Sequence, residues 1–115
     1  MNLQIFGTKR CANTKKAEMF FKERRMSYHL INMAEKPISK GELSSVLQSV
    51  SPEDLLDKES KAYKSQGLEY MKFDIVKKVL EDPSLFRTPI VRDGKRATVG
   101  YKPDIWKQWL AQTAK

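Results

Sequence analysis

One cysteine is the residue in this chain best suited to reaction chemistry. Cys11 is the only cysteine in the sequence, and it follows an apolar run (residues 3–6) and Gly7, where a strand is expected to end and a helix to begin. Four basic residues lie near it: Lys9, Arg10, Lys15 and Lys16. The partial positive charge of a helix N-terminus and nearby cations both favour a thiolate. The position therefore predicts a nucleophilic thiolate, beside a place where an oxyanion could bind.

Cys11 also has an unreactive interpretation, because a free cysteine often packs as a small buried hydrophobic side chain. Its place after Gly7 and among cations favours the reactive interpretation. The next polar residues, Asn13 and Thr14, could donate hydrogen bonds to a bound oxyanion or to the thiolate. They could equally serve only to cap the first helical turn, and the sequence leaves both roles open.

The length and composition suit one domain over residues 1–115 with its own core. Forty per cent of the residues are hydrophobic, and no apolar run approaches the roughly 20 residues of a membrane span. The N-terminus lacks a basic region followed by a long apolar stretch, and a single cysteine cannot form an internal disulfide. We therefore expect a cytoplasmic protein without a secretion signal or membrane segment.

The chain is basic, with a net charge of +8 from 22 basic and 14 acidic residues. The basic residues are spread from Lys9 to Lys115, which favours a solvated surface over a nucleic-acid site. An acidic protein partner is the alternative. We expect no direct binding to nucleic acid, no membrane binding and a monomeric state. The only histidine, His29, lies in an alternating segment typical of a strand surface, and one cysteine with one histidine provides too few ligands for a structural zinc site.

The first part of the chain predicts a strand, a helix and a second strand. Residues 2–6 form the first apolar strand, and residues 12–25 carry one apolar stripe that includes Phe20 and Phe21. Residues 27–31 form the second strand after a short link. A helical crossover of this length usually joins parallel neighbours.

The middle of the chain, residues 37–82, shows helical spacing and no strand pattern. Ser39 and Glu42 form a capping box that begins a helix running to about Val46. Pro52 begins a second, short helix that Leu55 and Leu56 could dock on the core, and further helices are expected at 59–66 and around 73–80.

The last part predicts a hairpin and a helix. Residues 89–92 and 96–100 flank Asp93-Gly94, which is a hairpin signal for a loop of two or four residues. Pro103 begins the last helix, whose apolar side is expected to consist of Ile105, Trp106, Trp109 and Leu110. The order βαβ, helical block, ββα predicts an α/β fold: a thioredoxin-like mixed four-stranded sheet flanked by helices, with a helical insertion at about 37–82.

The chain resembles the ArsC/Spx/YffB family from residue 2 to about residue 110. Three segments carry the likeness: Phe6-Gly7-Thr8-Lys9-Arg10-Cys11 with Lys15-Lys16-Ala17, then Thr88-Pro89-Ile90-Val91, then Gly100-Tyr101 with Trp106 to Leu110. The resemblance implies a cis peptide bond at Thr88-Pro89, close to Cys11. In this family, arsenate reductases attack arsenate with a cysteine thiolate, and a small thiol or a partner protein completes the reduction. Spx members bind RNA polymerase and regulate transcription instead.

The three arginines with which the family's arsenate reductases hold the oxyanion are out of register here. Their places hold Asp57, Thr88 and Tyr101. An anionic Asp57 would disfavour bound arsenate. Arg87, one residue before the second place, could still reach an anion near Cys11, or could be a solvated surface arginine. Gly100-Tyr101 is similar to the Spx branch, yet the Cys-x-x-Cys of many Spx proteins is absent because Thr14 stands at its second position.

Two functions from different classes follow from the resemblance. The first is an ArsC-like thiol-dependent reductase of undefined substrate and weak arsenate activity, in which Cys11 attacks an oxyanion or a mixed disulfide. An external thiol such as glutathione would then act as co-substrate, with no bound cofactor and no metal. The second is a non-catalytic Spx-like regulator that binds RNA polymerase or another acidic protein, and we favour the first. With Cys11 as the catalytic residue, the residues expected to bind substrate or thiol are Lys9, Arg10, Asn13, Thr14, Arg87, Thr88, Pro89 and Tyr101.

Overall fold

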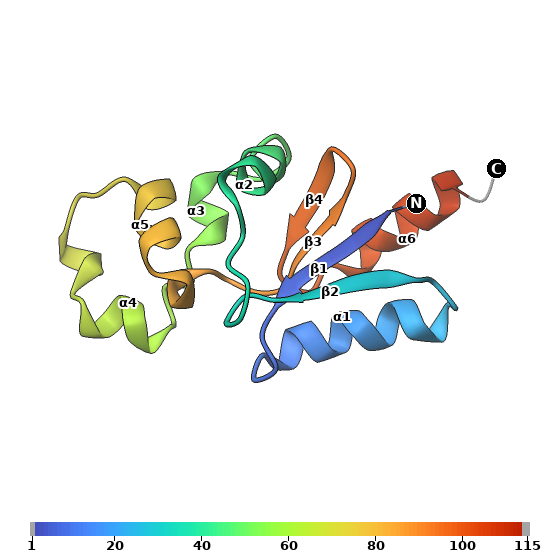
Figure 1. Cartoon of the computed structure of the whole chain (residues 1–115), viewed down its shortest axis with the longest axis horizontal. Coiled ribbons are helices and arrows are strands. Elements are labelled where there is room, and N and C mark those ends of the chain that lie inside the picture. The colour runs from blue at the N-terminus through green and yellow to red at the C-terminus, as the bar shows by residue number, and fades with distance from the viewer. Residues whose placement is uncertain (1, 114–115) are drawn as a thin grey trace.

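The computed structural model contains a four-stranded sheet in the order β2–β1–β3–β4, with helices on both faces (Figure 1). The structure describes residues 2–113. β1 (Leu3–Gly7) pairs in parallel with β2 (Tyr28–Asn32) and antiparallel with β3 (Ile90–Asp93), which pairs antiparallel with β4 (Arg96–Val99). This mixed sheet with flanking helices is a thioredoxin-like fold, as the sequence predicts.

α1 (Ala12–Glu23) connects the two parallel strands. It ends two residues earlier than the sequence predicts, and Arg25 follows in a left-handed conformation with φ 56° before β2 begins. At the same end of the sheet, the hairpin between β3 and β4 has a loop of only two residues, because Asp93 pairs with Arg96. Gly94, at the first loop position, has a φ of +60°, which glycine adopts at no steric cost.

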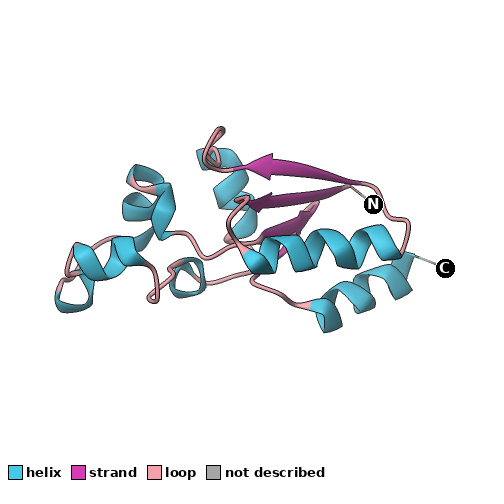
Figure 2. Ribbon diagram, turned by 90° about the horizontal axis from the view of Figure 1, so that it is seen from below, coloured by secondary structure: helices cyan, strands magenta, loops and turns pink. Residues whose placement is uncertain are grey.

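α1 and α6 (Pro103–Thr113) lie side by side on one face of the sheet (Figure 2). Their shared interface is aromatic, since the ring centroids of Phe20 and Phe21 lie 5.3 and 5.2 Å from that of Trp106. The indole nitrogen of Trp106 donates a hydrogen bond of 2.8 Å to the hydroxyl of Thr98, so this buried polar group is satisfied. The core role predicted for the tryptophans is confirmed, whereas Ile105 is 37% exposed and does not belong to the buried side of α6.

A helical block between β2 and β3 covers the other face of the sheet and extends beyond it. It consists of α2 (Lys40–Val46), α3 (Pro52–Leu55), α4 (Lys61–Ser65) and α5 (Ile75–Glu81), with 3₁₀ turns at Leu68–Tyr70 and Pro83–Leu85. The predicted capping box begins α2, because the side chains of Ser39 and Glu42 each accept a hydrogen bond from the other residue's backbone N–H. The helices α3, α4 and α5 form a lobe on the left of Figure 1, so the molecule is elongated, with extents of 47 × 26 × 24 Å.

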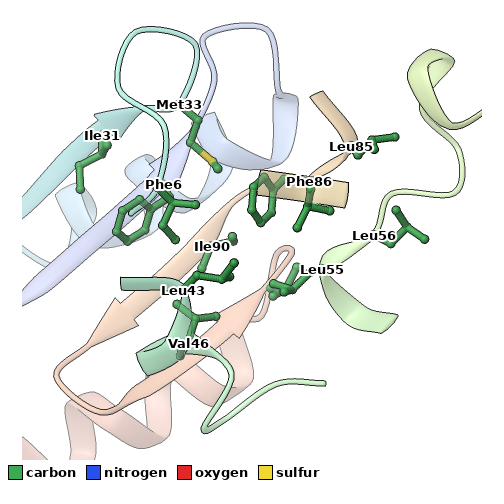
Figure 3. Packing of buried hydrophobic residues seen from close by; sticks show 14 of the residues in the cluster. Phe6, Ile31, Met33, Leu43, Val46, Leu55, Leu56, Leu85, Phe86 and Ile90 are labelled. Carbon is green, nitrogen blue, oxygen red and sulfur yellow. The ribbon is translucent and has the colours of Figure 1, made fainter. Parts of the chain in front are cut away.

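The helical block and the sheet share one hydrophobic core (Figure 3). Phe6 from β1 and Leu43 and Val46 from α2 are almost completely buried there. Leu55 and Leu56 are 0% and 2% exposed, which confirms that the short helix docks on the core through them. Within residues 2–113, no helix is long and apolar enough to cross a membrane.

A short stretch of backbone pairing joins the lobe to the segment that precedes Pro89. Leu56 and Phe86 form an isolated antiparallel bridge, an exception to the prediction that residues 37–82 contain no strand pairing. The N–H of Asp57 donates to the carbonyl of Leu85 at 2.8 Å, and the N–H of Arg87 donates to the carbonyl of Leu55 at 2.7 Å. This pairing determines which side chains of the two segments face Cys11.

Candidate thiol site

Cys11 lies at the N-cap position of α1, directly after the loop that leaves β1. Its backbone is extended, with φ −80° and ψ 115°, and its side chain is half-buried. The thiol donates a hydrogen bond of 3.5 Å to the carbonyl of Thr88. The Thr88-Pro89 peptide bond is cis, as the resemblance implies, and Pro89 is buried. The structure thus brings Cys11 and the Thr88-Pro89 segment together across 77 residues of sequence.

The pKa of the Cys11 thiol lies below its ordinary value. Burial is the largest single influence and raises the pKa, but four hydrogen bonds together outweigh it. They come from the side chains of Thr14 and Thr88 and from the backbone amides of Thr14 and Asn13. The sequence predicts the thiolate from a helix N-terminus and from nearby cations. The backbone amides at the start of α1 do contribute, whereas the cations are not among the causes of the shift.

Thr14 supports the thiolate because it is buried directly behind Cys11, with 2% of its surface exposed. Its Oγ1 has no other hydrogen-bond partner within the described part of the chain, so the hydroxyl is available to the ionised sulfur. Gly7 makes this position possible, since a Cβ on residue 7 would overlap the Thr14 side chain. A glycine is therefore required at the end of β1 by close packing against Thr14.

Cys11 opens into a surface hollow of about 350 Å³, which we call the thiol hollow. It is lined by Thr8, Arg10, Cys11, Asp57, Pro83, Ser84, Phe86 and Thr88. Besides the thiol, the hollow contains one cationic side chain, that of Arg10, and one anionic side chain, that of Asp57. Within residues 2–113, no group of three or more His, Cys, Asp or Glu side chains could hold a metal ion.

Arg87 does not line the thiol hollow. Phe86 has an extended backbone, with φ −66° and ψ 136°, so neighbouring side chains point to opposite sides. Phe86 and Thr88 face Cys11, whereas Arg87 lines a separate hollow of about 220 Å³ that also contains Lys102. We call it the cationic hollow, and its other lining residues are Ser49, Val50, Asp54, Ala97, Thr98, Val99 and Ile105. The expected approach of Arg87 to an anion at Cys11 is therefore not what the structure shows.

Two further residues of the expected site lie elsewhere. Lys9 lines a small hollow beside β2, on the far side of Thr14. Tyr101 is 40% exposed in a groove between α1 and α6. Its ring packs edge-on against Trp106 at 5.6 Å between centroids. Asn13 is exposed and contributes through its backbone amide rather than its side chain.

Sequence analysis did not select several residues that line the thiol hollow. Pro83, Ser84 and Phe86 belong to no motif around Cys11, and only the backbone pairing with the lobe brings them there. Asp57 stands at the place of a family arginine, and the sequence predicts only that its charge would disfavour bound arsenate. The structure shows that its side chain does line the site.

The comparison with known proteins agrees with the resemblance. The model of the ArsC family matches residues 6–109. A curated relative, "Global transcriptional regulator Spx 2" of Oceanobacillus iheyensis, is 30% identical over 115 residues, covering 96% of this chain and 84% of that protein.

Solved structures show the same fold at lower sequence identity. The "YFFB protein" superimposes with a TM-score of 0.82 and 21% identity, covering 93% of this chain and 97% of that one. The arsenate reductase from Vibrio cholerae superimposes with a TM-score of 0.80 and 18% identity, covering 94% and 97%. The family model spans the cysteine loop, the helical block and the cis-proline segment that form the thiol hollow. The chain belongs to the ArsC family.

Proposed function

We propose that this chain is a single-cysteine thiol-exchange protein, in which the Cys11 thiolate attacks a disulfide and an external thiol such as glutathione resolves the product. The observation that carries the proposal is the half-buried thiol with a lowered pKa, held by hydrogen bonds at the start of α1 and open to the thiol hollow. A thiolate is the form of cysteine that acts as a nucleophile. A reducing compartment such as the cytoplasm would supply the thiol.

The reaction consists of three thiol–disulfide exchange steps. The thiolate of Cys11 attacks one sulfur of the substrate disulfide, the substrate S–S bond breaks, and the other half leaves as a thiolate that takes a proton from water. Glutathione thiolate then attacks the mixed disulfide on its substrate sulfur and restores the Cys11 thiolate. A second glutathione then attacks the glutathione sulfur of this mixed disulfide and releases the remaining substrate half as a thiolate. The substrate disulfide is thereby reduced by two electrons, and two glutathione molecules are oxidised to one glutathione disulfide.

Arsenate is a poor substrate in this proposal. The places of the family's three oxyanion-binding arginines hold Asp57, Thr88 and Tyr101, and two of these side chains line the thiol hollow. A carboxylate there repels an oxyanion that arginines would clamp. Arg87 does not compensate, because it lines the cationic hollow.

The test is a glutathione-coupled assay with a small mixed disulfide of glutathione, carried out on the native chain, Cys11→Ser and Arg87→Ala. We expect turnover by the native chain, loss to background in Cys11→Ser, and less than a twofold change in Arg87→Ala. Arg87→Ala is the matched control, because it removes a cation that lies close in sequence but lines the other hollow. Equal rates for the native chain and Cys11→Ser would contradict the proposal.

A second candidate function is that of a Spx-type regulator that binds RNA polymerase. It is favoured by the 30% identity to a protein named as a global transcriptional regulator, which exceeds the 18% identity to the Vibrio cholerae arsenate reductase. The basic chain would meet an acidic partner surface. Gel filtration of the chain mixed with purified RNA polymerase tests this candidate: co-elution that persists in Cys11→Ser supports it, and separate elution contradicts it.

A further inference from the structure

We infer that Asp57 and Arg10 make the thiol hollow selective for amino-acid disulfides, which carry an ammonium group beside a carboxylate. This inference rests on the proposed exchange at Cys11 and names its substrate class. Of the side chains that line the hollow with Cys11, these two are the ones that carry a full charge, and their charges are opposite. An ammonium group would pair with Asp57 and a carboxylate with Arg10.

Asp57 is held firmly in the wall of the hollow. Its N–H donates to the carbonyl of Leu85 at 2.8 Å, and its Oδ1 accepts a hydrogen bond of 3.0 Å from the N–H of Glu59. The neighbouring residue Leu56 is 2% exposed and anchors the segment in the core. No cation pairs with the Asp57 carboxylate within residues 2–113. The carboxylate therefore retains capacity for a cationic group of a ligand.

Arg10 supplies the opposite charge from the loop that precedes α1. Its side chain is exposed and forms no ion pair within the described part of the chain. A guanidinium can bind a carboxylate through two parallel hydrogen bonds. Phe86, which is 4% exposed, adds an apolar wall suited to the methylene and sulfur atoms of the ligand.

Three kinds of disulfide differ in how well they pair with the charges of Asp57 and Arg10. A zwitterionic half can satisfy both charged side chains. A dianionic disulfide is attracted by Arg10 but repelled by Asp57, and a dicationic one is attracted by Asp57 but repelled by Arg10. In each case the Cys11 thiolate attacks one sulfur, the S–S bond breaks, and the second half leaves as a thiolate that is protonated by water.

Three symmetrical disulfides serve as probes: cystine, which is zwitterionic, cystamine, which is cationic, and 3,3′-dithiodipropionate, which is anionic. The rate of mixed-disulfide formation at Cys11 is measured by mass spectrometry for the native chain, Asp57→Asn and Arg10→Gln. Because leaving groups differ in intrinsic reactivity, each variant is compared with the native chain on the same probe. Asp54→Asn is the matched control, since Asp54 lines the cationic hollow.

We expect Asp57→Asn to slow mixed-disulfide formation with cystine and with cystamine by about three- to tenfold, as for loss of one charge contact at a partly exposed site. The same variant should react faster with the anionic probe. Arg10→Gln should react more slowly with cystine and with the anionic probe, and faster with cystamine. Asp54→Asn should change no rate by more than about twofold. Native-like circular dichroism of each variant confirms that it is folded.

The inference would be overturned if Asp57→Asn and Arg10→Gln changed the rates with all three probes equally, or changed none of them. Exchange at Cys11 would still stand in that case. Failure of all three disulfides to modify the native chain would instead overturn the proposed function, and the inference with it. The two failures are therefore distinguishable in one experiment.

Discussion

The thiol hollow and the cationic hollow share one short extended segment, residues 86–88, and yet differ in chemistry. Phe86 and Thr88 face the thiol hollow, where Cys11 ionises readily and Asp57 and Arg10 offer opposite charges. Arg87 faces the cationic hollow, where Lys102 adds a second positive charge and Asp54 is the one carboxylate among the lining residues. Each residue of this segment contributes to the hollow that its side chain faces. Its distance from Cys11 in the sequence does not determine that.

The helical lobe determines this arrangement. The bridge between Leu56 and Phe86, with its flanking hydrogen bonds, determines the orientation of residues 85–88 as a strand neighbour would. A shift of one residue in this pairing would exchange the two faces. An arginine at position 88 is therefore expected to face the thiol, whereas the arginine at position 87 is not.

The largest effect is expected when arginines are placed on the thiol side. Glutathione-coupled arsenate turnover by the native chain should be near background, and Asp57→Arg with Thr88→Arg should raise it by at least about tenfold, since single oxyanion donors contribute about 10²–10³ in rate where measured. Arg87→Ala should leave turnover unchanged, because that side chain lies in the other hollow.

Robust arsenate turnover by the native chain, abolished by Cys11→Ser, would contradict this comparison. It would show that the residues present already clamp an oxyanion. Native-like circular dichroism of the double variant serves as the control that it is still folded.

A second effect should separate stability from reactivity. Thr98 lies in the wall of the cationic hollow, and its hydroxyl accepts the hydrogen bond of the buried Trp106 indole. Thr98→Val leaves that N–H without its acceptor and should lower the free energy of unfolding by about 1–3 kcal/mol, measured by urea denaturation. Thr98→Ser, which keeps the hydroxyl, should lower the free energy of unfolding by less. The rate of Cys11 modification at low denaturant should be unchanged in both, and a large loss of rate would show that the two hollows are coupled.

The smallest effect is expected at Thr14. Thr14→Val removes a hydrogen bond that lowers the pKa of Cys11, so the pKa should rise. At neutral pH the thiolate fraction, and with it the alkylation rate, should fall. Asn13→Ala should change little, because only the backbone amide of Asn13 contributes. An unchanged Cys11 pKa in Thr14→Val would show that the Thr14 hydroxyl does not stabilise the thiolate.

Much of the fold could be predicted from local patterns. The alternation in residues 2–6, the capping box at Ser39 and the hairpin signal at Asp93-Gly94 each act over a few residues, and the structure confirms each element to within about two residues. The place of Cys11 at the start of α1 was predictable for the same reason, since Gly7 and the helical stripe that follows it are local signals.

The remaining features depend on contacts between distant segments. The side on which Arg87 lies is set by pairing with residues 55–57, which no pattern near Arg87 reveals. The sequence predicts the lowered Cys11 pKa from the start of a helix and from surrounding cations. The hydrogen bonds from Thr14 and Asn13 agree with the first cause, the cations do not contribute, and the bond with Thr88 comes from a distant segment. Exposed lysines and arginines are screened by water, whereas the hydrogen bonds at this half-buried thiol together outweigh the opposing effect of burial on its pKa.

The central claim is that Cys11 is a thiol with a lowered pKa, and the rate of its alkylation as a function of pH tests it most directly. Because Cys11 is the only cysteine, iodoacetamide labelling of the native chain reports on this residue alone. A lowered pKa means that the rate reaches half of its alkaline plateau below the value of about 8.5 of a free cysteine, and falls as the pH is lowered through that point. A midpoint at or above about 8.5 would contradict the account.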